Sequence, residues 1–287
     1  MKGSFKQRLT QYKGSPLSFI LYLMVSLSAL ATISVLIFIL GYIIIKGMPY
    51  LKPGLFSLHY TSENVSLVPA FINTVIMTVL ALCVSGPIGI SSAIYLVEYA
   101  KKGNKFVEVV RITSETLSGI PSIVYGLFGM LFFVGALGFG YSILSGALTL
   151  SIMILPLIMR TTEEALKTVP DSYREGSFGL GAGKLRTIVK IVLPTAMPGI
   201  LSGIILSIGR IAGESAALIY TAGTVASLPK NIFSSGRTLS VHMYALSSEG
   251  LFMNEAHATA VVLVVLVAAI NFLSSLIAKK FSSMERN

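Results

Sequence analysis

Residues 175–194 read Glu-Gly-Ser-Phe-Gly-Leu-Gly-Ala-Gly-Lys-Leu-Arg-Thr-Ile-Val-Lys-Ile-Val-Leu-Pro, and the stretch lies between two long apolar segments. Three of its side chains, Lys184, Arg186 and Lys190, are cationic. A basic, glycine-containing stretch between apolar segments is typical of a loop that joins two membrane-spanning helices.

The composition of the rest of the chain also indicates a membrane protein. Of its 287 residues, 54% are hydrophobic and only 12% are charged, and the mean hydropathy is +0.80. Soluble domains carry about a quarter charged residues. The net charge of +10 comes from basic residues in short loops, without a long basic run or an aromatic-interleaved patch, which excludes a nucleic-acid partner. The single Cys83 lies in an apolar segment and excludes a disulfide framework.

Six stretches are long and apolar enough to span a bilayer, which needs roughly 20 residues. They are residues 17–45, 69–97, 112–138, 141–159, 195–222 and 256–278. The first follows a basic start but is longer than the roughly 7–15 residues of a signal-peptide core, so we interpret it as an uncleaved span. The sequence therefore predicts an all-α polytopic membrane protein with six transmembrane helices.

The distribution of Lys and Arg predicts the orientation of these spans. One side would carry 17 of these residues, in the N-terminal tail, the 98–111 loop, the 160–190 loop and the C-terminal tail, and the other side only four. Because positive loops stay in the cytoplasm, both termini and the 160–190 loop are expected there.

The 160–190 loop is predicted to contain a short helix. Pro170 marks its start, and Gly181 and Gly183 suit a left-handed stop. Pro194 marks the entry to the fifth span. An ordinary amphipathic surface helix is the alternative to a docking element.

Catalytic chemistry finds no support in the sequence. The stretch from Gly181 to Leu185 lacks the spacing and the hydroxyl of a phosphate-binding loop. The histidines at 59, 242 and 257 are scattered rather than clustered, so neither a catalytic site nor a metal site is expected.

Two charged residues fall in the fifth span. Arg210 is expected near its middle, where a charge is costly and is therefore expected to face away from lipid. Glu214 is four residues later and would share a helix face with Arg210. Either the two charges neutralise each other at a subunit interface, or Arg210 offers its donor fork to an oxyanion in the pathway, with Glu214 holding the guanidinium.

The third span opens with residues 118–126, Ser-Gly-Ile-Pro-Ser-Ile-Val-Tyr-Gly. Pro121 is expected to kink or interrupt the helix, and Ser122 and Tyr125 could then present polar groups to a cavity. A packing kink is the alternative. The Gly-Pro pair at 86–87 predicts a similar break in the second span.

The polar loop resembles the coupling-loop signature of binding-protein-dependent ABC importer permeases. The matching positions are Glu175, Gly181, Ile191, Leu193 and Pro194. Gly176 and Ser177 depart from it, since the signature has two alanines there. The resemblance implies a type I ABC importer permease core, in which this loop docks on a separate cytoplasmic ATPase and the ATP and magnesium are bound by that subunit, with no cofactor in this chain.

Three strings resemble the PstA-type permease subunits of bacterial phosphate importers. They are residues 117–126, the Arg-Ile-Ala-Gly-Glu run at 210–214, and Thr-Ala-Gly at 221–223. The resemblance implies phosphate import across the bacterial inner membrane with a PstC-type permease, two copies of a PstB-type ATPase and a periplasmic or lipid-anchored phosphate-binding protein. The PstC-type subunit itself, a permease for another oxyanion or small solute, and a non-transport receptor or scaffold are the alternatives.

The expected organisation is a cytoplasmic tail at 1–16, a first helix at 17–45, a transport core at 69–278 that holds the coupling loop at about 160–194, and a second tail at 279–287. The outer segments 46–68 and 223–254 are expected to meet the binding protein, with capping of the bundle as the alternative.

Overall fold

The computed structural model describes residues 16–101 and 103–284, which form helices joined by loops. In chain order the elements are α2 (Pro16–Gly47), η1 (Met48–Tyr50), η2 (Pro53–Phe56), α3 (Val68–Ile94), η3 (Tyr95–Tyr99), α4 (Lys105–Ser118), α5 (Ser122–Gly129), η4 (Met130–Ala136), α6 (Ile143–Lys167), α7 (Asp171–Gly179), α8 (Lys184–Thr187), η5 (Ile188–Val192), α9 (Leu193–Ala212), α10 (Ala216–Ile219), α11 (Leu239–Glu249) and α12 (Met253–Met284). The all-α prediction is confirmed for the described residues.

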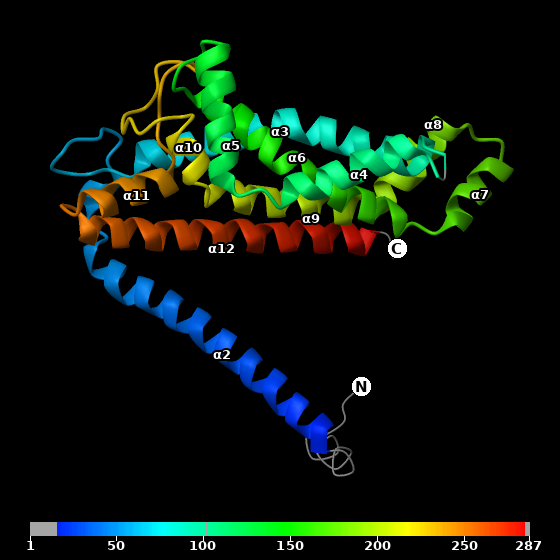
Figure 1. The fold of residues 1–287 in the computed structure, drawn as a ribbon, viewed down its shortest axis with the longest axis horizontal. Coiled ribbons are helices and arrows are strands. Elements are labelled where there is room, and N and C mark those ends of the chain that lie inside the picture. The colour runs from blue at the N-terminus through cyan, green and yellow to red at the C-terminus, as the bar shows by residue number, and fades with distance from the viewer. Residues whose placement is uncertain (1–15, 102, 285–287) are drawn as a thin grey trace.

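Helix α6 forms the centre of the bundle and is the most buried of the long apolar helices. It begins at a Ser142 cap, whose hydroxyl accepts the N–H of Ser145 at 3.2 Å. Leu150, Ile154 and Ile158 along α6 are almost completely buried, and α3 and α9 pack on either side of the helix (Figure 1). Burial of this apolar face from both sides makes α6 the axis on which the other helices are placed.

Small residues allow α9 to approach α6 closely. A Cβ atom on Gly199 would lie 2.6 Å from the Cβ of Ala165, and one on Gly203 would overlap the Thr161 side chain. The two glycines are four residues apart and therefore share a face of α9. This small-residue stripe is the arrangement that brings membrane helices together without a hydrophobic driving force.

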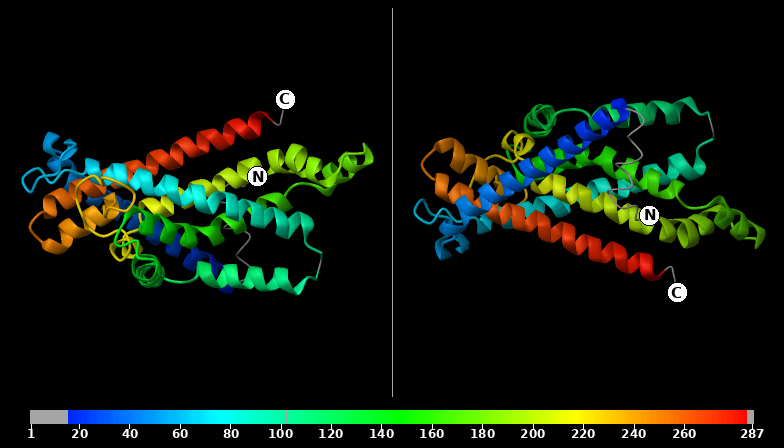
Figure 2. Two further views of the ribbon diagram at one scale, coloured as in Figure 1. Left: turned by 90° about the horizontal axis from the view of Figure 1, so that it is seen from above. Right: turned by 90° about the horizontal axis from the view of Figure 1, so that it is seen from below.

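Helix α2 leaves the bundle at an angle and meets it only near its C-terminal end (Figures 1 and 2). There Gly47 packs so tightly against α12 that a Cβ atom would overlap the carbonyl of His257. Most other side chains of α2 are exposed and apolar, which suits a helix surrounded by lipid or by another membrane subunit.

Five helices are long and apolar enough to cross a membrane, and a bent pair is the sixth candidate. The bent pair corresponds to the predicted third span. Instead of one kinked helix, α4 and the α5–η4 segment meet at 102° around residues 119–121. Pro121 lies at the N-cap of α5, where its missing N–H leaves no hydrogen bond unmade. The expected interruption is confirmed and is sharper than a packing kink.

Two other predictions for the spans are wrong. The fifth span does not reach residue 222, because α9 ends at Ala212 and is followed by a turn and the short α10. The second span has no break at Gly86 and Pro87, because α3 continues through Pro87. One missing hydrogen bond is tolerated within a membrane helix when its neighbours hold it in place.

The segments that were predicted to share one side of the membrane, because they are rich in Lys and Arg, lie toward the same end of the helix bundle. The start of α2, the end of α12 and the η3–α4 connection all lie toward the end of the bundle that carries α7 and α8 (Figures 1 and 2). Helix α11 and the loops around η1 and η2 lie at the opposite end. The predicted tail at 1–16 lies outside the described residues apart from Pro16, as do Lys102 and the last three residues of the tail at 279–287.

Candidate functional site

The predicted coupling loop folds as a helical hairpin at one end of the bundle (Figure 1). Helix α7 starts directly after Pro170 and ends before Gly181, whose φ of +83° gives the left-handed stop that was predicted. Gly183 is not left-handed; it has a φ of −72° and caps α8. Pro194 is the second residue of α9, as expected for the entry to the fifth span, although residues 184–212 form one continuous helical segment.

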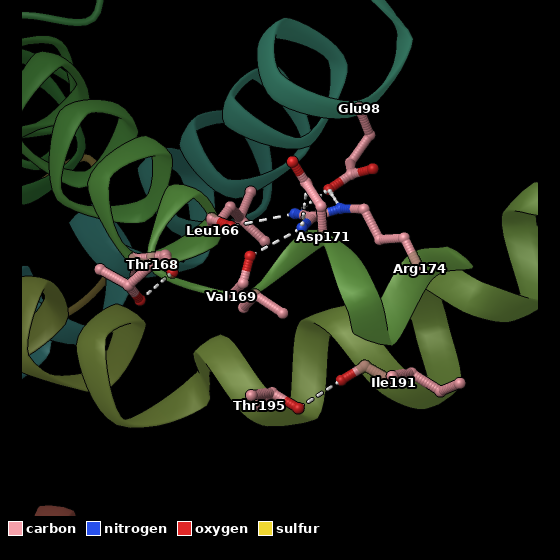
Figure 3. Close-up of polar contacts among 9 residues, drawn as sticks. Glu98, Leu166, Thr168, Val169, Asp171, Arg174, Ile191 and Thr195 are labelled. Carbon is pink, nitrogen blue, oxygen red and sulfur yellow. Dashed lines mark hydrogen bonds and ion pairs between the residues drawn. The ribbon is translucent and has the colours of Figure 1, made fainter. Parts of the chain in front are cut away.

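Arg174 fixes α7 to the body of the protein (Figure 3). Its Nε and Nη2 atoms both donate to Oε1 of Glu98 in η3, at 3.1 and 2.7 Å. Nη1 donates to the carbonyl of Val169 at 2.8 Å, and Nη2 to that of Leu166 at 3.0 Å. The Arg174 and Glu98 side chains are only 14% and 8% exposed, so this charge-assisted contact is shielded from water.

A second polar contact closes the hairpin from inside. The hydroxyls of Ser177 in α7 and Thr187 in α8 lie 2.8 Å apart, and both residues are buried. Ser177 is one of the two positions that depart from the alanine pattern. Its hydroxyl would be unsatisfied at a buried position without Thr187, so the two residues are chemically matched.

The outer side of the hairpin is apolar and open. Leu180 is 92% exposed, and Tyr173, Phe178 and Leu185 are also exposed. Next to them is a groove of about 480 Å³. It is lined by Ser172, Tyr173, Gly176, Ser177, Leu180, Gly181, Ala182, Arg186, Lys190 and Ile191. Exposed apolar side chains beside cations are typical of a protein-docking surface.

The five predicted coupling residues lie at different levels of this hairpin. Glu175 is exposed on α7, outside the groove, while Gly181 and Ile191 line it. Leu193 and Pro194 are the first residues of α9, just beyond the π-helical turn η5. The anchor Arg174 and its partner Glu98 were missed. An arginine directly before Glu175 and a lone acid at the end of an apolar span were the signals that could have paired them.

The predicted face shared by Arg210 and Glu214 does not exist. Arg210 lies in the last turn of α9, where its charge complements the helix C-terminus, and Glu214 lies in the turn beyond. Glu214 Oε1 accepts the N–H of Ala217 at 3.0 Å and so caps α10. Among the described residues no ion pair joins the two side chains.

The fold brings the predicted third-span residues next to this turn. Gly126 lies against the backbone of Ala217, so that a Cβ atom there would be 2.8 Å from the Ala217 Cα. Tyr125, the residue directly before Gly126, is buried and donates its hydroxyl to the carbonyl of Leu117 at 2.7 Å. Ser122 is half-buried at the start of α5.

Several charged residues in α4 and α6, near the coupling end, form ion pairs. Glu163 Oε1 lies 2.7 Å from both Arg111 and Lys167, and Arg160 pairs with Glu164 at 3.1 Å. Within residues 16–101 and 103–284, no three potential metal ligands cluster. Arg210, in the last turn of α9, forms no ion pair with any of the described residues.

Comparison with known proteins places this geometry in context. Residues 85–284 match the family described as "Binding-protein-dependent transport system inner membrane component". The chain is 32% identical to the probable ABC transporter permease protein YqgI of Bacillus subtilis (strain 168), over 91% of this chain and 96% of that protein. It is 36% identical to the phosphate transport system permease protein PstA 1 of Mycobacterium tuberculosis (strain CDC 1551 / Oshkosh), over 72% of this chain and 69% of that protein.

Solved structures share the fold. A chain of the MetNI methionine ABC transporter, in inward-facing conformations, superposes with a TM-score of 0.63 at 21% identity, covering 75% of this chain and 95% of that one. A chain of a bacterial alginate ABC transporter, in complex with an alginate-bound periplasmic protein, gives a TM-score of 0.68 at 15% identity, covering 94% and 97%. The fold is that of type I ABC importer permeases.

Proposed function

Because the chain belongs to the family of binding-protein-dependent transport system inner membrane components, we propose that it is the PstA-type permease subunit of an ATP-driven phosphate importer. The relatives named as PstA permeases support the choice of phosphate. ATP hydrolysis would be the task of a separate subunit. A PstB-type ATPase dimer would bind ATP and magnesium, and a PstC-type permease would form the other half of the gate.

One structural observation carries the mechanism. Residues 184–212 form a single helical segment that begins beside the docking groove and carries Arg210 in its last turn. At about 1.5 Å per residue it spans roughly 40 Å, which is longer than a bilayer core. A displacement of the hairpin by an ATPase is thus delivered along one rigid element to the unpaired cation.

The proposed cycle uses the residues as the structure positions them. Exposed Leu180 and the groove beside it would receive the ATPase, and Arg174 would make α7 move together with Glu98 at the end of the second span. Arg210, in the last turn of α9, would contact the oxyanion with its donor fork. ATP favours the state it binds more tightly, and this difference in affinity would drive the gate.

The arrangement in the membrane is part of the proposal. Residues 69–278 would form the transport core, with α2 as an added helix on its outside. Both termini and α7 would face the cytoplasm, and the segments 46–68 and 223–254 would meet a phosphate-binding protein. Crosslinkers at exposed Ser62 and Asn231 should capture that protein in intact membranes; crosslinks only to the partner permease would show that these segments merely cap the bundle.

Uptake of radiolabelled phosphate into vesicles containing the complete complex tests the function. We expect uptake that needs ATP and the binding protein, and that excess phosphonate, molybdate or sulfate does not reduce. Uptake of one of those anions instead would favour the other-oxyanion alternative. If the chain co-purifies with a PstA-type permease rather than a PstC-type one, the chain is itself the PstC-type subunit. Absence of any ATP-dependent uptake would favour a receptor or scaffold.

A further inference from the structure

A second cation is buried at the end of the bundle opposite α7. Arg237 lies in the segment that leads into α11 and is only 5% exposed. Its backbone is held in place, because its N–H donates to Val225 O at 2.9 Å and its carbonyl accepts from Asn73 Nδ2 at 3.2 Å. These bonds hold the residue in a fixed position while its side chain remains enclosed.

The guanidinium of Arg237 has no acceptor along one edge. Its Nε and Nη2 atoms are both buried and without a hydrogen-bond partner. In Arg174 the same two atoms both donate to the carboxylate of Glu98. The edge of the guanidinium that binds a carboxylate in Arg174 therefore has no acceptor in Arg237. A buried charge without a counter-charge is costly, so this edge is suited to an anion.

The surroundings of Arg237 add a donor and an aromatic wall. The Tyr60 ring covers the guanidinium with its centroid 4.9 Å from Cζ, and the His242 ring meets the same Tyr60 edge-on at 6.2 Å. His242 is fully buried, and neither ring nitrogen makes a hydrogen bond of normal geometry, although the Val65 backbone lies nearby. Val65 has a φ of +47°, a strained conformation for a β-branched residue.

We propose that Arg237 and His242 form a binding site for a small oxyanion at the outer end of the permease, on a different element from Arg210. Nε–H and Nη2–H of Arg237 would make a bidentate contact, and a neutral His242 would donate one ring N–H. The enclosure by Tyr60 fits a compact anion rather than an acidic segment of a partner protein. Entry requires the 53–67 loop, which carries Tyr60, to move outward.

The role of this site follows from its position. An oxyanion released at the outer end would be held at Arg237 before it reaches Arg210, so the two cations would act in sequence. The identification of the bound anion as phosphate rests on the proposed function. The unfilled edge of Arg237 does not depend on it.

Equilibrium binding of radiolabelled phosphate to the purified complex in nanodiscs tests the proposal. The soluble binding protein is omitted, and magnesium with a non-hydrolysable ATP analogue keeps the ATPase closed. Arg237→Gln should weaken binding by about 10- to 100-fold, since charge-assisted hydrogen bonds are lost. Arg237→Lys keeps the charge but loses the fork and should give an intermediate affinity. Lys230→Gln removes an exposed cation from the same loop and should leave binding unchanged.

The outcomes separate this site from the proposed function. Binding that persists in Arg210→Gln and is lost in Arg237→Gln supports the site. Equal phosphate affinity in wild type, Arg237→Gln and Arg237→Lys overturns it. If the complex binds sulfate or molybdate but not phosphate, and Arg237→Gln abolishes that binding, the site stands and the phosphate function falls. If the wild-type complex binds none of these anions, the site is rejected. If the Arg237→Gln complex does not assemble, the test is the comparison of phosphate affinity in Arg237→Lys and Lys230→Gln. Weaker binding in Arg237→Lys alone then supports the site, and equal binding in the two variants overturns it.

Discussion

Arg174 in the hairpin and Glu98 at the end of η3 are 76 residues apart in sequence and meet through two hydrogen bonds to one carboxylate oxygen. The contact ties α7 to the continuation of α3. Arg174 also donates to the carbonyls of Leu166 and Val169 at the end of α6. Helix α7 is therefore linked to the second and fourth spans, and it also packs against α8 and η5, which lead into α9.

Replacing Arg174 with Met should loosen α7 and uncouple ATP turnover from uptake. Removal of one partner leaves Glu98 charged and buried, which costs about 3–5 kcal/mol. The double variant Arg174→Met with Glu98→Leu should recover much of the stability but not the coupling, because no contact then transmits the movement. Thermal unfolding of the complex and the ratio of phosphate imported to ATP hydrolysed measure the two effects.

A matched control for this prediction is Glu164→Gln. Glu164 pairs with Arg160 on the surface, where both side chains are more than half exposed. Such pairs contribute about 0–1 kcal/mol. An Arg174→Met complex with wild-type stability and wild-type coupling would show that the buried contact transmits nothing.

Gly181→Ala should destabilise the hairpin through backbone strain alone. A Cβ atom there would meet nothing within 4 Å, but a φ of +83° costs an L residue about 1–2 kcal/mol. Gly179→Ala is the control, since that glycine is helical, its surroundings are equally open, and alanine favours the helix by about 0.5–1 kcal/mol. Hydrogen exchange across residues 171–190 should speed up in the first variant and slow down in the second; opposite changes would contradict the assignment of the turn.

Arg210→Gln should abolish phosphate uptake without reducing the amount of assembled complex. Because Glu214 caps α10 instead of pairing with Arg210, adding Glu214→Gln should not restore uptake. Glu214→Gln alone keeps an acceptor for Ala217, whereas Glu214→Ala loses it and should cost about 1.5–3 kcal/mol. Uptake normalised to assembled complex distinguishes these cases, and recovery in the double variant would assign Arg210 a purely structural role.

The stability of the outer end should depend on pH through His242. Burial, and then the charge of Arg237, lowers the pKa of His242 from 6.5 to about 3. The unfolded chain therefore binds the extra proton first, so stability is complete above pH 6.5 and falls as the pH drops from 6.5 toward 3. The slope is about 1.4 kcal/mol per pH unit. In anion-free buffer, melting temperatures between pH 7.5 and 5 should fall less in His242→Asn; parallel curves would refute this.

The sequence predicted the helices better than their ends. Apolar length located every long helix, because the bilayer requires it. Hydropathy could not show that α9 stops at Ala212, since the turn at Gly213–Ser215 is only three residues long and the apolar residues of α10 follow it directly. It also could not give the 102° bend at Pro121, because proline marks an interruption but not the direction in which the next helix packs.

In the candidate sites, features that depend on local sequence were predictable and contacts between distant residues were not. The left-handed turn at Gly181 was predictable, because only local backbone chemistry decides it. Helical spacing wrongly placed Arg210 and Glu214 on one face, since the helix ends between them. The Arg174–Glu98 contact and the enclosure of Arg237 under Tyr60 depend on residues far apart in sequence, which no local pattern reveals.

The π-helical turn η5 contains one residue more than a regular α-helix would need between α8 and α9. Deleting a single residue such as Val189 would restore α-helical spacing and rotate the hairpin by about 100° around the axis of α9. The groove would then face away from its docking partner even though every side chain that lines it was kept. The number of residues between Gly181 and Ile191, which is nine, therefore sets the rotation of the hairpin around the axis of α9. Insertions or deletions there should be far more harmful than substitutions.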